Sequence, residues 1–150
     1  MLGARTSGHL YFRGYLYLPS SFAIAPAGSR ASLLVLGENS AELGGISLVL
    51  WDDSLSLNIR GQATSDVKVP VLPARDRWLC VQIDFEIATS ANARLRIDGA
   101  LVAQGTRNTL MATSYDRLWV GVNWLPPEQI DDVRVFYDDV VVDTREVGCE

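Results

Sequence analysis

The sequence has no excess of positive charge. Its 13 lysine and arginine residues are outnumbered by 18 aspartate and glutamate residues, and the formal net charge is −5. Nucleic acids and anionic membrane surfaces are bound through basic surfaces, so this balance disfavours both as the main partner. No apolar run approaches the ~18–20 residues of a membrane span, and the first ten residues lack the apolar segment of a signal peptide. We therefore expect a soluble, acidic protein without a membrane span.

Residues that bind soft metals or act as nucleophiles are also scarce. Cys80 and Cys149 are the two cysteines and His9 is the one histidine, which is too few ligands for a zinc site. The cysteines are either two free thiols or one disulfide, and the disulfide is favoured because Cys149 lies in a tail that would otherwise fray. A disulfide indicates an extracellular or cell-surface location. Since no export signal precedes it, we expect the chain to be one domain of a longer secreted protein.

Helical periodicity is absent, and alternation of apolar and polar residues takes its place. In the segment 10–18, Leu10, Phe12, Leu16 and Leu18 fall on one face, which is typical of a half-buried strand. A second such segment runs over 78–87. Turn residues separate about ten strands, and this spacing predicts an all-β sandwich or barrel. The expected strands are 10–18, 32–36, 46–51, 55–60, an edge strand at 67–72, 78–87, a hairpin over 94–102, 118–124, and 132–142 with a bend near 137–139.

The chain reads as one domain. With 150 residues, 48% of them hydrophobic, it is long enough to bury a core. No internal repeat, low-complexity run or linker divides it. We expect a single domain over 1–150 with tails at about 1–8 and 143–150.

Four short motifs in order carry a resemblance to a known architecture. They are W-x-x-V at 78–81, L-x-I-D-G at 95–99, L-x-V-G at 118–121 and I-D-D-V-x-V at 130–135. This set resembles the concanavalin A-like lectin/glucanase jelly roll, shared by laminin-G-like and polysaccharide-lyase-like domains, and the two cysteines are similar to those of jelly-roll domains in secreted bacterial proteins. The resemblance implies a two-sheet antiparallel β-sandwich, a glycan site on the concave sheet, and a Cys80–Cys149 disulfide.

The resemblance to glucanases and lyases extends poorly to their catalytic residues. Related glucanases carry E-x-D-x-E on one strand, whereas this chain has Gln82, Asp84 and Glu86, and an amide cannot act as the nucleophile. The strands that resemble the catalytic strands of alginate-lyase-like domains lack their glutamine, histidine, tyrosine and lysine, although Arg13 and Tyr15 match part of the pattern. We therefore lean against an enzyme, and a degenerate lyase or glycoside hydrolase remains an alternative.

Aromatic and hydrogen-bonding residues on strand faces point instead to carbohydrate binding. Tyrosine and tryptophan rings stack on the C–H faces of sugars, and arginine and asparagine bind hydroxyl groups. The resemblance implies that the first strand and the L-x-V-G strand share the concave sheet, with Val120 and Val122 facing the core. The alternative is that these side chains merely cover a solvated sheet. The candidate ligand residues are Tyr11, Arg13, Tyr15, Tyr17, Trp51, Trp119 and Asn123.

A structural calcium ion is the one metal that the pattern favours. Many jelly-roll domains hold calcium at the sandwich edge, and carboxylates suit this hard cation. Of the pairs 131–132 and 138–139, Asp132 is the better candidate, and no cofactor is required for binding. Trp78 is expected to be a packing anchor, and Asp98 to be structural in its Asp-Gly turn.

The expected function is therefore non-catalytic recognition of a polysaccharide or glycan by the concave sheet. A structural or adhesion module that binds protein through a sheet face is the main alternative. Light scattering separates the two, because an adhesion module would show a mass that rises with concentration and no glycan binding.

Overall fold

The computed structural model describes residues 3–23, 29–37, 45–51, 54–59, 67–69, 73–109, 114–124 and 133–150, the side chains of 68, 123 and 124 excepted. Within these ranges the regular structure consists of β-strands, which confirms the all-β prediction. No helix in the described part of the chain is long and apolar enough to cross a membrane. The strands are β1 (Gly8–Tyr17), β2 (Arg30–Gly37), β3 (Ile46–Trp51), β4 (Leu55–Ile59), β5 (Val67–Val69), β6 (Trp78–Ile87), β7 (Ala91–Ile97), β8 (Ala100–Arg107), β9 (Arg117–Trp124) and β10 (Phe136–Asp143).

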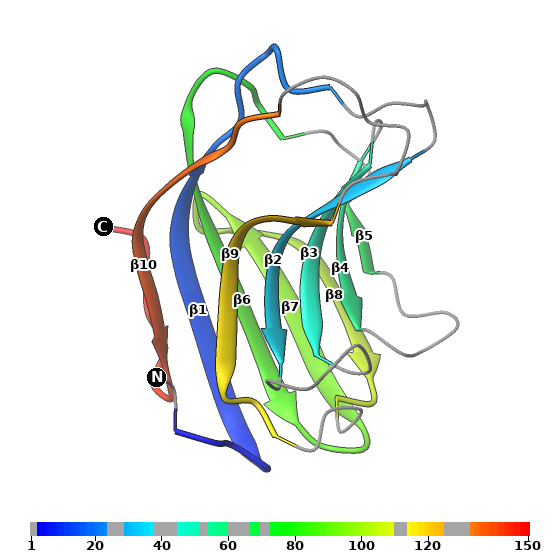
Figure 1. Cartoon of the computed structure of the whole chain (residues 1–150). Coiled ribbons are helices and arrows are strands. Elements are labelled where there is room, and N and C mark those ends of the chain that lie inside the picture. Colours follow the sequence, from blue (N-terminus) through cyan, green and yellow to red (C-terminus); the bar gives the residue numbers. More distant parts are fainter. Residues whose placement is uncertain are drawn as a thin grey trace.

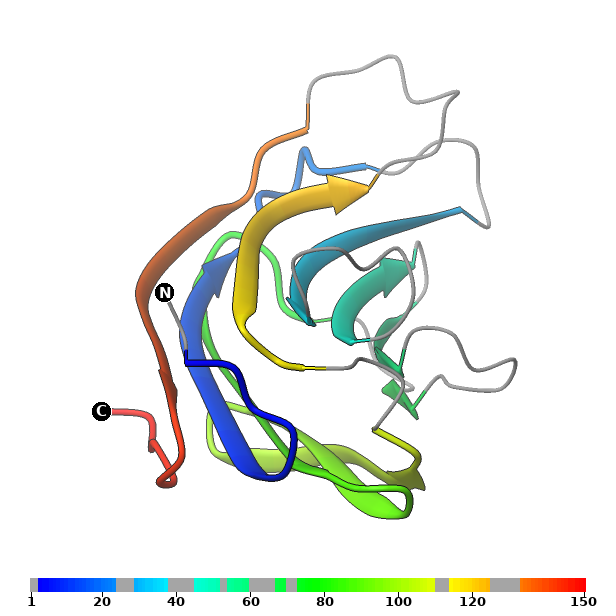
Figure 2. The same cartoon turned by 60° about the horizontal axis from the view of Figure 1, so that its bottom comes forward.

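The strands form two five-stranded antiparallel sheets packed face to face. One sheet has the order β10-β1-β6-β7-β8 and the other has the order β5-β4-β3-β2-β9 (Figure 1). Both sheets curve in the same direction, and Figure 2 shows the first wrapped around the second. The outward face of the β10-β1-β6-β7-β8 sheet is therefore convex, and that of the β5-β4-β3-β2-β9 sheet is concave. We call these the convex face and the concave face.

The core lies between the two sheets and follows the predicted alternation. Leu10, Phe12 and Leu16 of β1 are at most 3% exposed, and Phe85 of β6 and Leu57 of β4 are fully buried. Strands such as β1 and β6 contribute every second side chain, because successive side chains point to opposite faces of a sheet. Burial of this apolar surface is the main favourable contribution to folding.

A β-bulge bends β10 where the sequence predicts a bend. The register with β1 shifts between Arg13 and Tyr15, and Asp139 there has a left-handed backbone with φ of 47°. Gly14 lies opposite the bulge, where an added Cβ would come within 2.9 Å of the Phe12 ring. The bulge increases the local twist and re-aims the carboxylate of Asp139 toward β1.

The Asp98-Gly99 turn has the structural role expected of it. Both residues have positive φ, 52° and 79°, as a tight hairpin turn requires. One oxygen of the Asp98 carboxylate accepts a hydrogen bond from the Cys80 backbone N–H at 2.9 Å, and the other pairs with Arg77 at 2.7 Å. The turn thereby fastens the β7–β8 hairpin to the start of β6.

Tyr137 ties β10 to the opposite sheet. Its hydroxyl donates a hydrogen bond to the backbone carbonyl of Leu33 in β2. Burial raises the pKa of the Tyr137 hydroxyl far above its usual value, so the group remains a donor. This contact links the edge of the convex sheet to the sheet that carries the concave face.

Candidate functional site

The structure divides the predicted ligand residues between the two sheets. The β1 residues Tyr11, Arg13, Tyr15 and Tyr17 point outward on the convex face, because their neighbours Leu10, Phe12 and Leu16 fill the core. Strand β9 instead joins β2 in the other sheet. The expectation that the first strand and the L-x-V-G strand share the concave sheet is therefore wrong. Alternation determines which face of a strand is buried, but not which sheet the strand joins.

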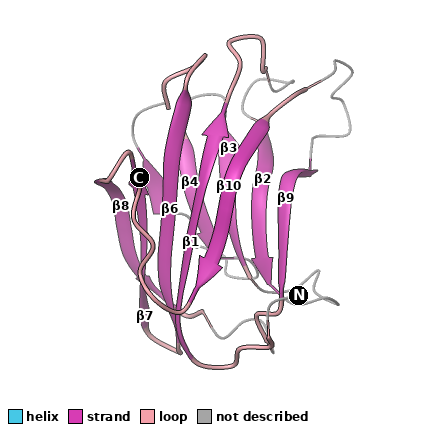
Figure 3. Ribbon diagram, turned by 90° about the vertical axis from the view of Figure 1, so that its left-hand side faces the viewer, coloured by secondary structure: helices cyan, strands magenta, loops and turns pink. Residues whose placement is uncertain are grey.

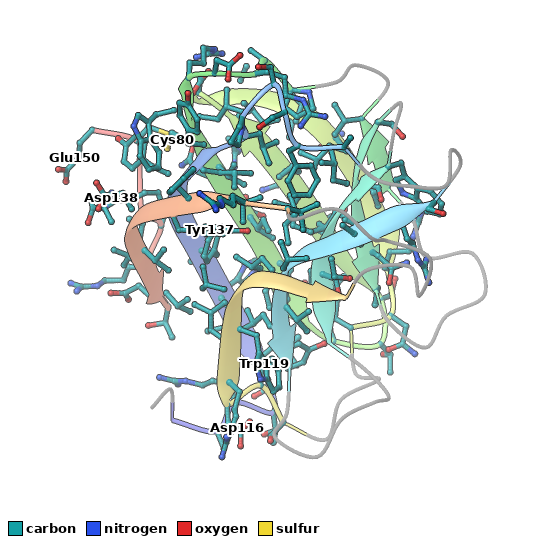
Figure 4. The ribbon with its side chains drawn as sticks, turned by 45° about the horizontal axis from the view of Figure 1, so that its top comes forward. Cys80, Asp116, Trp119, Tyr137, Asp138 and Glu150 are labelled. Atoms are coloured by element: carbon teal, nitrogen blue, oxygen red, sulfur yellow. A yellow bond between two sulfur atoms is a disulfide. The ribbon has the colours of Figure 1, made fainter. Side chains whose placement is uncertain are left out.

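The concave face carries Trp119 at one end of a cross-strand row. Trp119 of β9 lies opposite Val35 of β2, which lies opposite Ser47 of β3, which in turn lies opposite Asn58 of β4. The Trp119 and Asn58 side chains are half-buried, whereas Val35 and Ser47 are 4% and 2% exposed. The row thus offers an indole at one end and an amide at the other, separated by small side chains (Figure 4 labels Trp119).

Trp51 lies on the same concave face at the end of β3. The guanidinium of Arg30, its partner on β2, stacks over the indole at 5.5 Å from the ring centre. The indole Nε1 donates a hydrogen bond to the Ser56 hydroxyl at 3.0 Å. Both contacts hold the half-buried ring in one orientation, with Arg30 over one of its faces.

Two other β9 expectations have different outcomes. Val122 packs against the core as expected, but Val120 is 39% exposed, so its predicted core position is wrong. Gly121 beside it has φ of 117°, which interrupts the alternation. The backbone of Asn123 continues β9, and its side chain lies outside the described residues.

The centre of the convex face is covered by the last residues of the chain. The predicted disulfide between Cys80 and Cys149 is confirmed. Gln82 Nε2 donates a hydrogen bond to the Val147 carbonyl at 2.8 Å, and the Tyr15 hydroxyl donates one to the Glu150 carbonyl at 2.8 Å. Figure 3 shows this segment running back over β6, and Figure 4 shows Cys80 and Glu150 on the same side of the molecule. A ligand therefore cannot use this central region while the tail is in place.

Arg13 is held by internal contacts. Its side chain is 5% exposed, and its guanidinium forms an ion pair with the more exposed Asp139 carboxylate at the bulge. The hydrogen bond to Asp139 raises the pKa of Arg13 further above its ordinary value. We interpret Arg13 as a residue that fixes the β1–β10 pairing.

Replacing Arg13 by alanine is expected to lower the free energy of unfolding by about 1.5–3 kcal/mol, because a charged hydrogen bond is lost. Glycan affinity of the folded variant should remain that of the parent chain. Urea denaturation and calorimetric titration measure the two effects. Unchanged stability together with lost binding would instead make Arg13 a ligand residue.

The Gln82-x-Asp84-x-Glu86 strand also has structural partners. Gln82 is 8% exposed and binds the tail, and Asp84 is 5% exposed. The Asp84 carboxylate pairs with Arg96 at 2.7 Å and with Arg94 at 3.7 Å. Arg94 and Arg96 thus lie on the convex sheet. These contacts assign Gln82 and Asp84 to holding neighbouring segments together.

Three aromatic side chains form a cluster on the part of the convex face that the C-terminal tail leaves uncovered. Tyr17 lies opposite Phe136 on β10 and opposite Trp78 on β6, with ring centres 5.9 and 5.6 Å apart. Phe136 is 49% and Trp78 is 45% exposed, so the expectation that Trp78 is a packing anchor is wrong. Position 78 falls on the outward face by alternation, and that signal could have revealed its exposure. We call these three residues the aromatic row.

The calcium prediction falls on a residue that the structure does not describe. Asp132 lies outside the described ranges. Among the residues that are described, no group of three or more histidine, cysteine, aspartate and glutamate side chains gathers into a metal site. Asp139 pairs with Arg13, and the Asp138 carboxylate accepts the backbone N–H of Asp139 at 2.8 Å. Calcium at Asp132 stays a prediction.

Comparison with solved structures shows the fold. The chain is similar to a structure described as showing that cell entry of botulinum neurotoxin type C depends on interaction with two ganglioside molecules (TM-score 0.67, 11% identity, 94% of this chain and 33% of that one). It is also similar to a cellulose-induced protein (TM-score 0.62, 16% identity, 97% and 72%) and to an endo-β-1,4-glucuronan lyase from the fungus Trichoderma reesei (TM-score 0.63, 15% identity, 95% and 71%).

These similarities establish a concanavalin A-like jelly roll, as the sequence motifs imply. At identities of 11–16% they establish the fold alone. The chain spans about a third of the length of the toxin chains that it matches. No protein-family model matches the chain, and no curated protein matches it in sequence.

Proposed function

We propose that this chain is a non-catalytic carbohydrate-binding module that takes a glycan on its concave face. The observation that carries the proposal is the presence of Trp51 and Trp119 on that one face, each half-buried and at outward positions of β3 and β9. Half-buried indoles offer flat apolar surface while their buried edges keep them in place. This is the arrangement that stacks on the C–H faces of pyranose rings.

Little of the surface between the two indoles is accessible. Ser47 and Val49 of β3 are 2% and 3% exposed, and Asn58 of β4 is half-buried. The contacts with a sugar chain would therefore come from the two indoles and from Asn58, whose amide exchanges hydrogen bonds with hydroxyl groups. Because few side chains take part, we expect weak affinity at a single site.

The similar structures support this class of ligand. Those with the same fold include a toxin whose cell entry depends on ganglioside molecules and a lyase described by its action on glucuronan. The disulfide supports an extracellular or cell-surface location, since disulfides persist mainly in oxidising compartments. A glucanase-like activity is disfavoured for two reasons. Gln82 stands where related glucanases carry the nucleophile, and its amide is bound to the tail.

Binding of the purified chain to a broad glycan and polysaccharide array tests the proposal. We expect a specific hit, and Trp119→Ala should weaken it about tenfold, because burial of roughly 60–100 Å² of ring surface is lost. Repeating the array with added calcium and with a chelator tests the predicted ion at Asp132. Loss of binding with chelator would support that ion.

The convex-face variant Leu101→Ala is the matched control, because Leu101 is 49% exposed on the opposite sheet. It should leave the hit unchanged. A hit that Trp119→Ala leaves unchanged would contradict the concave placement. A blank array with folded protein, together with a mass that rises with concentration in light scattering, would favour the protein-binding alternative.

A further inference from the structure

The aromatic row of Tyr17, Trp78 and Phe136 is a second exposed surface that the concave site does not use. Trp78 and Phe136 are among the few large hydrophobic side chains that stay exposed in the described residues, and both flank Tyr17. Tyr17 stands at 60° to the Trp78 ring and at 75° to the Phe136 ring. It therefore meets both neighbours at steep angles and separates them, which leaves part of each outer ring open to solvent.

The Asp76 carboxylate fixes the segment after β1, since it accepts the backbone N–H of Ser20 at 2.8 Å. This hydrogen bond holds the pKa of Asp76 below its usual value. Tyr17, at the end of β1, packs against both outer rings. The row is thus preorganised, and a ligand that binds it meets little cost of ordering side chains.

A hollow of about 410 Å³ continues the row at Phe136. Pro19, Ser21, Arg134 and Phe136 line it. It lies where the segment before β10 crosses the segment after β1, at the top of Figure 1. Arg134 is exposed and forms no ion pair within the described residues, whereas Arg77 on the other side of the row is paired with Asp98. The hollow therefore presents an available cation beside an exposed ring.

The exposed ring surface is too small for a stable protein interface. Together, the exposed parts of Trp78 and Phe136 amount to roughly 200 Å², against the ~800 Å² per partner that a standard interface buries. Two rings that are two strands apart, about 10 Å, match instead the separation of next-neighbouring sugar rings in an extended chain. The exposed Arg134 guanidinium, which forms no ion pair within the described residues, adds a preference for a negatively charged sugar.

The geometry points to a second carbohydrate site on the convex face, in which Trp78 and Phe136 stack on pyranose rings and Arg134 pairs with the carboxylate of a uronate residue. This site lies on the opposite sheet from Trp51 and Trp119, so it stands or falls independently of the concave site. Its ligand class is an acidic β-linked polysaccharide. Two sites on opposite faces would also let one module bridge two glycan chains.

Calorimetric titration with two oligosaccharides of equal length and linkage tests this site. One is β-1,4-linked oligoglucuronate and the other is the uncharged cello-oligosaccharide. Oligoglucuronate should bind more tightly. Trp78→Ala and Phe136→Ala should each weaken that binding about tenfold, because the stacked ring surface is lost. Arg134→Gln should reduce the preference for the charged chain about two- to fivefold, the range for an exposed ion pair. Added salt should also reduce this preference, because it screens the charges.

Leu101→Ala is the matched control, because Leu101 is 49% exposed on β8 of the same sheet but lies outside the row. It should leave both affinities unchanged, and Trp119→Ala should leave the oligoglucuronate affinity unchanged. Absence of oligoglucuronate binding, or binding that neither Trp78→Ala nor Phe136→Ala weakens, would overturn the proposal. So would self-association that Trp78→Ala abolishes, since the row would then be a contact between copies of the chain. If the convex site fails these tests while Trp119→Ala still weakens the hit on the array, the proposed function stands.

Discussion

Replacing Cys149 by serine is expected to lower the free energy of unfolding by about 4 kcal/mol, one of the two largest effects that we predict. The disulfide joins residues 69 positions apart, and in the chain-entropy description a closed loop of this size restricts the unfolded chain by about that amount. For a domain of 150 residues this corresponds to a fall in Tm of roughly 10 °C. Thermal and urea denaturation, with and without a reductant, measure the change.

The same substitution should release the tail. Without the disulfide, the hydrogen bonds from Gln82 to the Val147 carbonyl and from Tyr15 to the Glu150 carbonyl are the main remaining contacts. The first is part-buried and the second is exposed, and such bonds contribute about 1 kcal/mol each. Amide hydrogen exchange over 144–150 should therefore become fast in the variant. Reduced parent chain is the control and should match Cys149→Ser, whereas a parent chain that melts at the same temperature with and without reductant would refute the account.

Replacing Tyr115 by alanine is expected to cost about 3–5 kcal/mol, the range for removing a large buried aromatic side chain. Tyr115 is fully buried, and its ring centre lies 5.3 Å from that of Phe85. Its backbone pairs with that of Arg5, and it stands just before β9. We therefore expect the substitution to disturb the start of β9 and to weaken glycan binding at Trp119. Urea denaturation and the array measure the two consequences.

The Tyr115→Phe variant separates packing from hydrogen bonding. The Tyr115 hydroxyl donates a hydrogen bond to the Thr109 carbonyl. Removing the hydroxyl alone leaves that buried carbonyl without this donor and should cost about 1–3 kcal/mol. A loss from Tyr115→Ala no larger than the loss from Tyr115→Phe would contradict the packing role.

Much of the fold is predictable because alternation and turn chemistry act over short distances. The strands at 46–51 and 78–87 agree with the predicted ranges. The Asp98-Gly99 turn is where the dipeptide indicates it, since its positive φ values suit these residues. The short edge strand β5 lies at the edge of its sheet, as its flanking prolines indicate.

Less of the candidate site is predictable, because it depends on which strands become neighbours. Tyr15 and Trp119 have the same outward pattern in the sequence, yet one lies on the convex face and the other on the concave face. The choice depends on long-range pairing of β1 with β6 and of β2 with β9. Periodicity within a strand carries no information about such pairing.

The roles of Arg13 and Trp78 could not be assigned from residue type for a related reason. Arginine on an outward face is expected to be solvated, but Arg13 is buried and paired with Asp139 at the bulge. Tryptophan is expected to be a packing residue, but no described segment covers Trp78 as the tail covers Tyr15. Burial on a sheet face is determined by what crosses it, and that is a tertiary property.

The most direct test of the central claim is to follow the indole N–H signals of the four tryptophans by NMR while the isotope-labelled chain is titrated with the glycan that the array identifies. Single Trp→Phe variants assign the signals. For an uncharged glycan the account predicts that the signals of Trp51 and Trp119 shift together and saturate, while that of Trp78 stays in place. Binding that shifts the Trp78 signal alone, or that leaves both concave-face signals unmoved, would contradict a glycan site on the concave face.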